Sequence, residues 1–211
     1  MAKSRAAKAR QRERAAAQEV NVDSPLRIRA PLIAALFMLV IGVTLLIVSL
    51  VPNSNGARIN TAADRPTGVA NFEVSSQRHV AGTVSYAQTP PVGGDHAPAW
   101  QNCGAYADPV PTEQAVHSLE HGAVWITYAS NIAVDERAAL QRIAADQTYV
   151  LASPWKGEPL RAPIVASAWG YQLELTTSSD PRLDEFLRTF RQGSQAPEPG
   201  APCTRGVGSP L

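Results

Sequence analysis

The feature that most constrains this chain is an uncharged run from Pro31 to Val51, PLIAALFMLVIGVTLLIVSLV. An α-helix needs about 20 apolar residues to cross a bilayer, and this run meets that length. Pro31 suits a helix start, and Pro52 ends the run. The run is too long for a typical signal-peptide core, and no small-residue cleavage site follows it. We therefore expect an uncleaved signal-anchor, with a transmembrane helix over residues 30–51.

The charges on either side of this run differ in sign. Residues 1–29 carry eight Lys or Arg and three acids, whereas the part after the run carries eleven Lys or Arg and fifteen acids. The positive-inside rule then predicts a cytoplasmic basic tail, residues 1–29, and an extracytoplasmic C-terminal part of a single-pass plasma-membrane protein. Lipid headgroups are the expected partner of the tail, with another membrane protein a further candidate. We expect no nucleic-acid binding, because no aromatic residue accompanies the charge.

Residues 52–71 are small, polar and turn-rich, which predicts a linker. Residues 72–205 form the expected extracytoplasmic domain, of fold class α+β. A thioredoxin-like β-α-β-α-β-β-α arrangement is the alternative, although the chain has no C-x-x-C. The Pro- and Gly-rich segment 88–111 excludes regular structure for most of its length. The patterns predict strands over 80–86, 123–128, 149–152, 163–169 and 171–175, and helices over 111–121, 134–147 and around 183–190.

The four histidines of the chain are His79, His96, His117 and His121, and all lie within about 43 residues. His117 and His121 belong to the motif HSLEHG and are four residues apart, which places them on one face of a helix. Two imidazoles at that spacing can bind one metal ion. We expect at least three of the four to form a site for copper or zinc, since imidazole suits both and no thiolate is required. Glu120 lies about 100° around the helix from His121 and need not face the metal.

Two other interpretations of the histidines stay open. The spelling H-x-x-E-H also matches inverted zincins, in which Glu120 would be the general base of a zinc-dependent hydrolase. Its third ligand would be a carboxylate, with Glu174, Glu185 and Glu198 as candidates by position. Alternatively, the histidines are only packed in a structural or partner-binding module. The first hypothesis, a metal-binding protein for metal handling or metalloenzyme assembly, does not require an enzyme.

Cys103 and Cys203 both lie in the part expected to be extracytoplasmic, where an oxidising compartment favours a disulfide. The bridge would close a loop of about 100 residues, worth about 4–5 kcal/mol in the chain-entropy model. The alternative makes Cys103 a metal ligand beside His96 and leaves Cys203 unpaired.

The assembled motifs resemble a family of bacterial single-span membrane proteins of unknown function, common in actinobacteria. The resemblance rests on P-P-x-x-G-x-H at residues 90–96, C-G-x-Y at residues 103–106 and HSLEHG at residues 117–122. Val92, Gly93 and Asp95 depart from the family pattern. The resemblance implies the single-span topology and a shared site built on the histidines, but no reaction. It also implies Tyr86, Tyr106 and Trp169 as candidate walls of the site.

Overall fold

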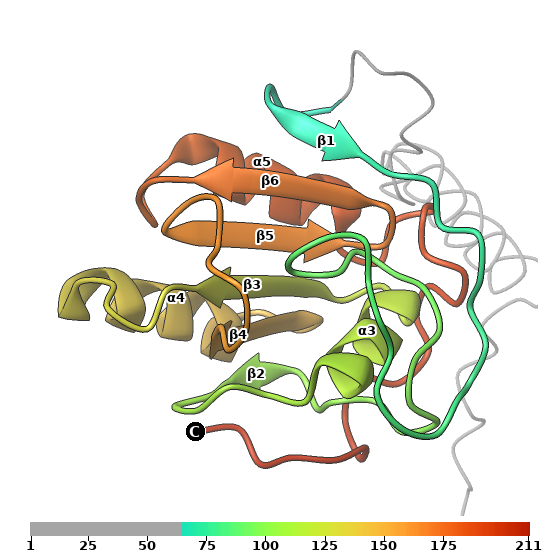
Figure 1. Ribbon diagram of the computed structural model, residues 1–211. Helices are drawn as coiled ribbons and strands as arrows, with labels where there is room; N and C mark the ends of the chain where they lie inside the picture. The colour runs from blue at the N-terminus through green and yellow to red at the C-terminus, as the bar shows by residue number, and fades with distance from the viewer. Residues whose placement is uncertain (1–64) are drawn as a thin grey trace, which may run out of the picture. The chain divides into compact units, whose positions relative to one another are not determined.

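The computed structural model describes residues 65–211, in which six strands form one sheet with the order β1-β6-β5-β3-β4-β2 (Figure 1). β3 lies inside this sheet, and its five residues, VWITY, are all buried, as expected for a β-branched and aromatic strand. In chain order the elements are β1 (Val69–Asn71), β2 (Gly104–Ala105), α3 (Thr112–Glu120), β3 (Val124–Tyr128), α4 (Val134–Asp146), β4 (Val150–Pro154), β5 (Ile164–Ala168), β6 (Tyr171–Leu175) and α5 (Pro181–Phe190).

The sheet is mixed in direction. β3 pairs in parallel with β4, and β4 in parallel with β2, whereas β5, β6 and β1 each pair antiparallel with their neighbours. The parallel β3–β4 pair needs a crossover connection, and the 13-residue helix α4 supplies it. A tight turn at Gly170, whose φ is +74°, joins β5 directly to β6.

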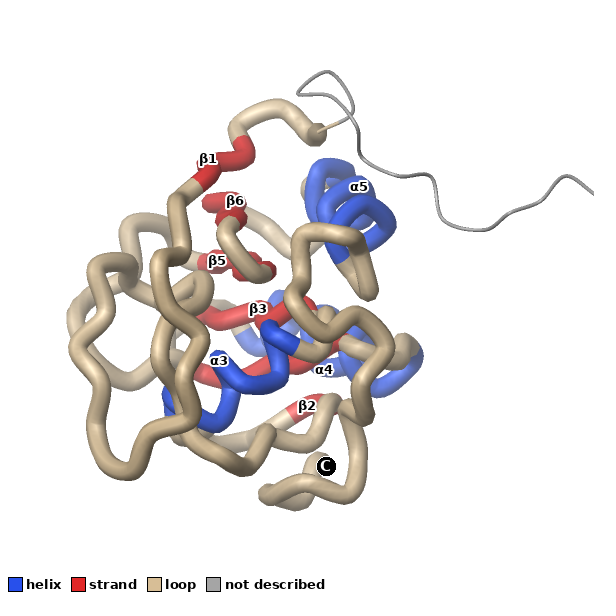
Figure 2. Tube along the Cα trace, turned by 90° about the vertical axis from the view of Figure 1, so that its right-hand side faces the viewer, coloured by secondary structure: helices blue, strands red, loops and turns tan. Residues whose placement is uncertain are grey.

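The two faces of the sheet bury different elements, because alternate residues of a strand point to opposite sides. Val124 and Ile126 of β3 pack in the larger apolar cluster with α4 and α5, whereas Trp125 packs in a smaller cluster with Leu119 of α3. Figure 2 shows α4 and α5 on one side of the sheet and α3 with the long segment before it on the other. The side that carries α3 therefore also carries the segment with His79 and His96.

The C-terminal segment after α5 has no regular structure but is fixed at several points. The Cys103–Cys203 disulfide is present, which confirms the predicted pair. Gln192, Glu198 and Gly200 donate backbone N–H bonds of 2.8–3.2 Å to the carbonyls of residues 120–122. These bonds satisfy carbonyl groups that the end of α3 leaves without helical partners. The segment is thus attached directly to the helix that carries HSLEHG.

The expected fold class, α+β preceded by a transmembrane helix, is wrong for the described residues. Helix α4 links the parallel neighbours β3 and β4 in a mixed sheet. The thioredoxin-like order β-α-β-α-β-β-α is not matched either, because three consecutive strands, β4, β5 and β6, precede α5. Within residues 65–211, no helix combines the length and the apolar character that a bilayer crossing requires. The segment 30–51, on which the transmembrane prediction rests, lies outside the described residues.

Two local predictions also differ from the structure. The strand predicted over 80–86 is absent, and this region instead pairs through one isolated β-bridge at its start, between His79 and His96. β1 lies in the last residues of the expected linker, where Val69–Asn71 pair with β6. Apolar alternation predicted the strand over 80–86, but alternation cannot show whether a neighbouring strand is available to pair with it.

Candidate metal centre

Helix α3 carries three chelating side chains on one face. His117, Glu120 and His121 occupy positions i, i+3 and i+4, which are neighbours on a helix surface. The helix ends at Glu120 with His121 as its C-cap, and Gly122 follows with φ of +94°, the left-handed conformation expected of a glycine at this position. All three side chains are at most 4 % exposed. The predicted pair therefore forms, and Glu120 joins it.

His79 and His96 reach the helix from two extended segments that lie side by side. The backbone N–H of Val80 donates to the His96 carbonyl at 2.8 Å, and that of His96 donates to the Arg78 carbonyl at 3.0 Å. Asp95 strengthens the pairing, because its carboxylate accepts a 2.7 Å bond from the Arg78 guanidinium. This bond is the main reason that the pKa of Asp95 lies well below its ordinary value. Asp95, although it departs from the family pattern, thus helps to hold His79 beside His96.

Backbone carbonyls fix three of the imidazole rings. The Nδ1 atoms of His96, His117 and His121 lie 2.8, 2.7 and 2.6 Å from the carbonyl oxygens of Gly94, Ala97 and Pro202. A carbonyl oxygen can only accept, so each Nδ1 must carry the hydrogen and donate it. In the neutral rings, each Nε2 is then left with a free lone pair. Metal-binding histidines are commonly held in this way by the second ring nitrogen.

The free ring nitrogens converge on Glu120. Its Oε2 atom lies 3.0 Å from His96 Nε2, 3.7 Å from His79 Nε2 and 4.0 Å from His117 Nε2. One ligand atom from each of these four residues can be chosen so that all lie within 4.8 Å of one another. Ligand atoms of a tetrahedral zinc ion are about 3.3–3.4 Å apart. The distances from Glu120 Oε2 to the three Nε2 atoms, 3.0–4.0 Å, include this value. This His/Glu cluster could hold a metal ion.

His121 adjoins the cluster through its contact with His117. The two Nε2 atoms lie 3.0 Å apart, and the Nδ1 hydrogen of each ring already points at a carbonyl. Two lone pairs would repel at this distance, so a proton or a metal ion must lie between the rings. Burial is the main cause that lowers the pKa of His117 to about 4, with smaller contributions from the other three histidines. At neutral pH the His117 ring is therefore neutral.

Aromatic rings and one exposed histidine define the walls of the centre. Trp169 packs edge-on against His96 at a centroid distance of 6.1 Å, which agrees with its predicted position at the site. Trp100, which the sequence did not single out, lies 5.8 Å from the His117 ring and 5.1 Å from the His121 ring. The His79 side chain is 50 % exposed and stacks on His117. Solvent therefore reaches the cluster from the side of His79.

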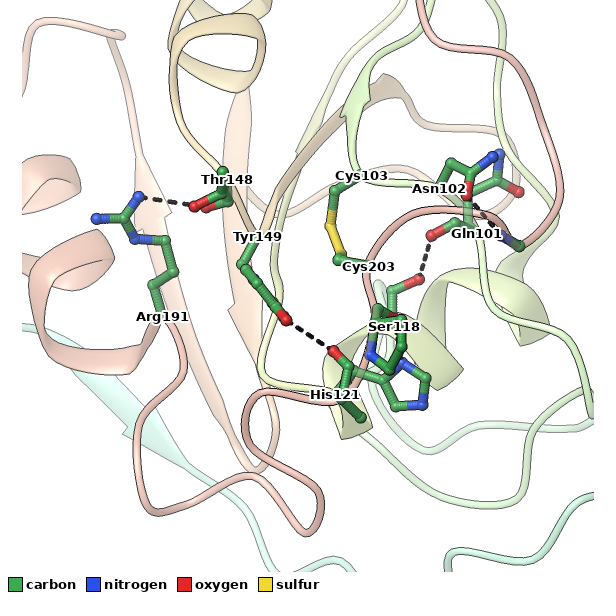
Figure 3. The surroundings of a disulfide bond; sticks show 12 residues. Gln101, Asn102, Cys103, Ser118, His121, Thr148, Tyr149, Arg191 and Cys203 are labelled. Carbon is green, nitrogen blue, oxygen red and sulfur yellow. Dashed lines mark hydrogen bonds between the residues drawn. A yellow bond between two sulfur atoms is a disulfide. The ribbon is translucent and has the colours of Figure 1, made fainter. Parts of the chain in front are cut away.

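The disulfide lies next to the other end of the cluster. Cys203 follows Pro202, whose carbonyl orients His121. Cys103 lies two residues after Gln101, whose carbonyl accepts a 2.7 Å hydrogen bond from Ser118. Figure 3 shows Ser118 and His121 beside the sulfur atoms. Cys103 is paired, so the alternative in which it binds metal beside His96 is excluded in this structure.

The remaining predicted site residues are divided between the cluster and other parts of the fold. Glu198 lies 3.8 Å from His121, whereas Glu174 on β6 and Glu185 on α5 belong to neither His/Glu group. Tyr86 donates to the Asp95 carbonyl and Tyr106 to the Asn102 carbonyl, so both support loops near the site. Glu120 was not expected to face the metal, but the structure places its carboxylate among the ring nitrogens of the cluster, because Glu120 is i+3 from His117.

A family model described as a protein of unknown function, DUF3105, matches residues 79–205. The chain belongs to this family. The DUF3105 match begins at His79 and includes Cys203, so it contains the whole His/Glu cluster and the disulfide. The predicted resemblance to a family of unknown function is thereby confirmed, while its motif pattern and actinobacterial type stay predictions. Searches among curated proteins and among solved structures found no match to the chain.

Proposed function

We propose that this DUF3105 domain is a metal-binding module that holds Cu(II) or Zn(II) with His79, His96, His117 and Glu120. The observation that carries the proposal is the orientation of the rings. Two buried cluster histidines, His96 and His117, donate Nδ1–H to a carbonyl and direct Nε2 toward Glu120. A set of three imidazoles and one carboxylate suits both metals.

The chemistry of the set also argues against merely packed histidines. Neither buried imidazoles nor a buried carboxylate is stable in contact without hydrogen-bond donors or a cation between them. Among the described residues, the hydrogen-bonding neighbour of Nε2 is Glu120 for His96, and another imidazole for His117 and His121. A metal ion would satisfy these atoms together. It would displace any bound protons, so its binding should release protons and weaken in acid.

The hydrolase alternative receives less support from the same geometry. A general base must stand beside a metal-bound water, free to take its proton. Glu120 is instead 4 % exposed, 3.0 Å from His96 Nε2, and placed among the ligand atoms. We therefore favour a role in metal handling or metalloenzyme assembly. The exposed ring of His79 would be the side at which a partner, such as another membrane protein, delivers or receives the ion.

The sequence before the described residues supports a location for this role. The uncharged run 31–51 and the basic residues before it favour a plasma-membrane protein with its C-terminal part outside the cytoplasm. The disulfide agrees with an oxidising compartment. A reporter enzyme that is active only outside the cytoplasm, fused after Leu211, should be active, and activity of a cytoplasm-dependent reporter there would exclude this location.

Metal titration of the full-length chain in detergent tests the proposed ligands. The chelator-treated protein should bind Zn²⁺ or Cu²⁺ stoichiometrically, as measured by isothermal titration and elemental analysis. His96→Ala and Glu120→Gln should each weaken metal binding at least about tenfold. Removing a residue that hydrogen-bonds to a metal ligand already costs about that much affinity, and removing the ligand itself should cost no less. Glu185→Gln, an exposed substitution on α5, is the matched control for charge and should not change the affinity. No stoichiometric metal, or wild-type affinity in His96→Ala, would refute the proposal.

A further inference from the structure

His121 stands apart from the other three histidines in a way that the single-ion site does not use. It forms a separate group with Glu120 and Glu198, whose ligand atoms also lie within 4.8 Å of one another. Its side chain is 4 % exposed, and its Nε2 points between His117 at 3.0 Å and Glu198 at 3.8 Å. A buried imidazole nitrogen with a lone pair and two carboxylates nearby is a set that binds divalent metals.

We infer that the centre holds two divalent metal ions, with the second bound by His121, Glu198 and Glu120. This inference rests on the proposed function, since the first ion is the one held by His79, His96 and His117. Glu120 is common to both groups. A carboxylate has two oxygens and can give one to each ion.

One ion could not use all of these side chains at once. Ligand atoms about 2.1 Å from a metal can be no more than about 4.2 Å apart. The rings of His79, His96 and His121 each contact the His117 ring, at centroid distances of 4.7, 4.8 and 4.5 Å. Among the described residues, the ligand atoms of His121 come together with those of Glu120 and Glu198 rather than with those of His79 and His96. The centre is therefore extended along the helix face, with His117 and Glu120 between its two ends.

The C-terminal segment is built to complete the second position. Glu198 N–H donates to the Glu120 carbonyl at 3.0 Å, and Gly200 N–H donates to the His121 carbonyl at 3.2 Å. Pro202 orients the His121 ring, and the disulfide holds the next residue. These bonds keep the backbone of Glu198 at the end of α3. Its side chain is 58 % exposed, so solvent would reach the second ion from the side of Glu198.

The two ligand sets differ in character. The first has three imidazoles and one carboxylate, whereas the second has one imidazole and two carboxylates. Imidazole-rich sites suit copper and zinc, and added carboxylates shift the preference toward harder divalent ions. The second position should therefore bind Zn²⁺ well and exchange it more readily than the first.

Stoichiometry and spin coupling together test the second ion. The full-length chain in detergent should bind two equivalents of Zn²⁺ by elemental analysis and titration. Loaded with Cu²⁺, it should show a magnetically coupled pair by electron paramagnetic resonance, because ions that share a carboxylate lie about 3.5–4 Å apart. Glu198→Gln should lose the second equivalent, with affinity at least about tenfold lower, and restore the spectrum of an isolated Cu²⁺ ion.

Glu185→Gln is again the control, and Glu198→Gln should fold normally because the wild-type side chain is mostly in solvent. One tightly bound equivalent, unchanged in Glu198→Gln, would overturn the second ion and leave the first site standing. Two uncoupled equivalents that are insensitive to Glu198→Gln would also overturn it, since the second ion would then lie elsewhere. Binding of no metal would overturn both the inference and the proposed function.

Discussion

Acid should destabilise the metal-free protein through His117 in a defined pH window. The His117 ring is 3 % exposed, and burial lowers its pKa from 6.5 to about 4. The unfolded chain therefore binds a proton at His117 near pH 6.5, whereas the folded chain does not bind it until about pH 4. The free energy of unfolding decreases as pH falls wherever the unfolded state binds more protons than the folded state. The contribution of His117 is thus fully present above pH 6.5 and is lost progressively down to about pH 4.

The size of the effect follows from the difference between the two pKa values. One unit corresponds to 1.36 kcal/mol, so His117 should lower the free energy of unfolding by about 3 kcal/mol across this window. That is a large fraction of the 5–15 kcal/mol typical of folded domains. Neighbouring groups also titrate, so the effect must be measured as a difference between two proteins.

The comparison is between the wild type and His117→Gln, both as full-length chains in detergent with a chelator. Urea unfolding followed by near-ultraviolet circular dichroism gives the free energy of unfolding at several pH values from 7.5 to 4. The wild type should lose about 3 kcal/mol more than the variant over this range, because the glutamine does not titrate. Equal losses in the two proteins would show that His117 is not a buried, neutral ring in the folded protein.

Two further predictions concern the parts of the fold that support the centre. Cys103→Ala/Cys203→Ala should lower the free energy of unfolding by about 4–5 kcal/mol in urea titrations, because the bridge closes a loop with a sequence separation of 100; a loss below about 1 kcal/mol would contradict the chain-entropy argument. Gly122→Ala should cost more than about 1 kcal/mol and more than Gly200→Ala. Both glycines have positive φ, but a Cβ at Gly122 would lie 2.9 Å from the Gln192 Cα atom, whereas one at Gly200 meets nothing within 4 Å. Equal thermal stabilities of these two variants would show that the close approach of Gln192 is unimportant.

The helical part of the centre could be predicted from sequence because local spacing determines it. His117 and His121 are four residues apart on a helix that ends at a glycine, and the structure has both features. The same rule also places Glu120 beside His117, because residues three apart are neighbours on a helix surface. The prediction for Glu120 considered only its angle to His121, and so did not anticipate that its carboxylate lies among the ring nitrogens. The disulfide could be predicted from the number of cysteines and their expected compartment.

The remainder of the centre depends on contacts between distant residues, which spacing does not reveal. The His79–His96 bridge joins two irregular segments, and the apolar alternation of residues 80–86 does not indicate which segment lies beside His79. Trp100 reaches His117 and His121 only because the loop before α3 folds back against the helix. The parallel pairing of β3 and β4 also escaped prediction, although the strand–helix–strand order favours it.

The ring anchors have a consequence for how the protein tolerates sequence change. The groups that orient His96, His117 and His121 are main-chain oxygens, which every amino acid supplies. Replacing the side chain of Ala97 therefore leaves its hydrogen bond to His117 intact, provided that the backbone path is kept. Insertion or deletion of a single residue near these carbonyls would move them and turn the rings. The geometry of the centre should thus tolerate point substitutions in its supporting loops far better than changes in their length.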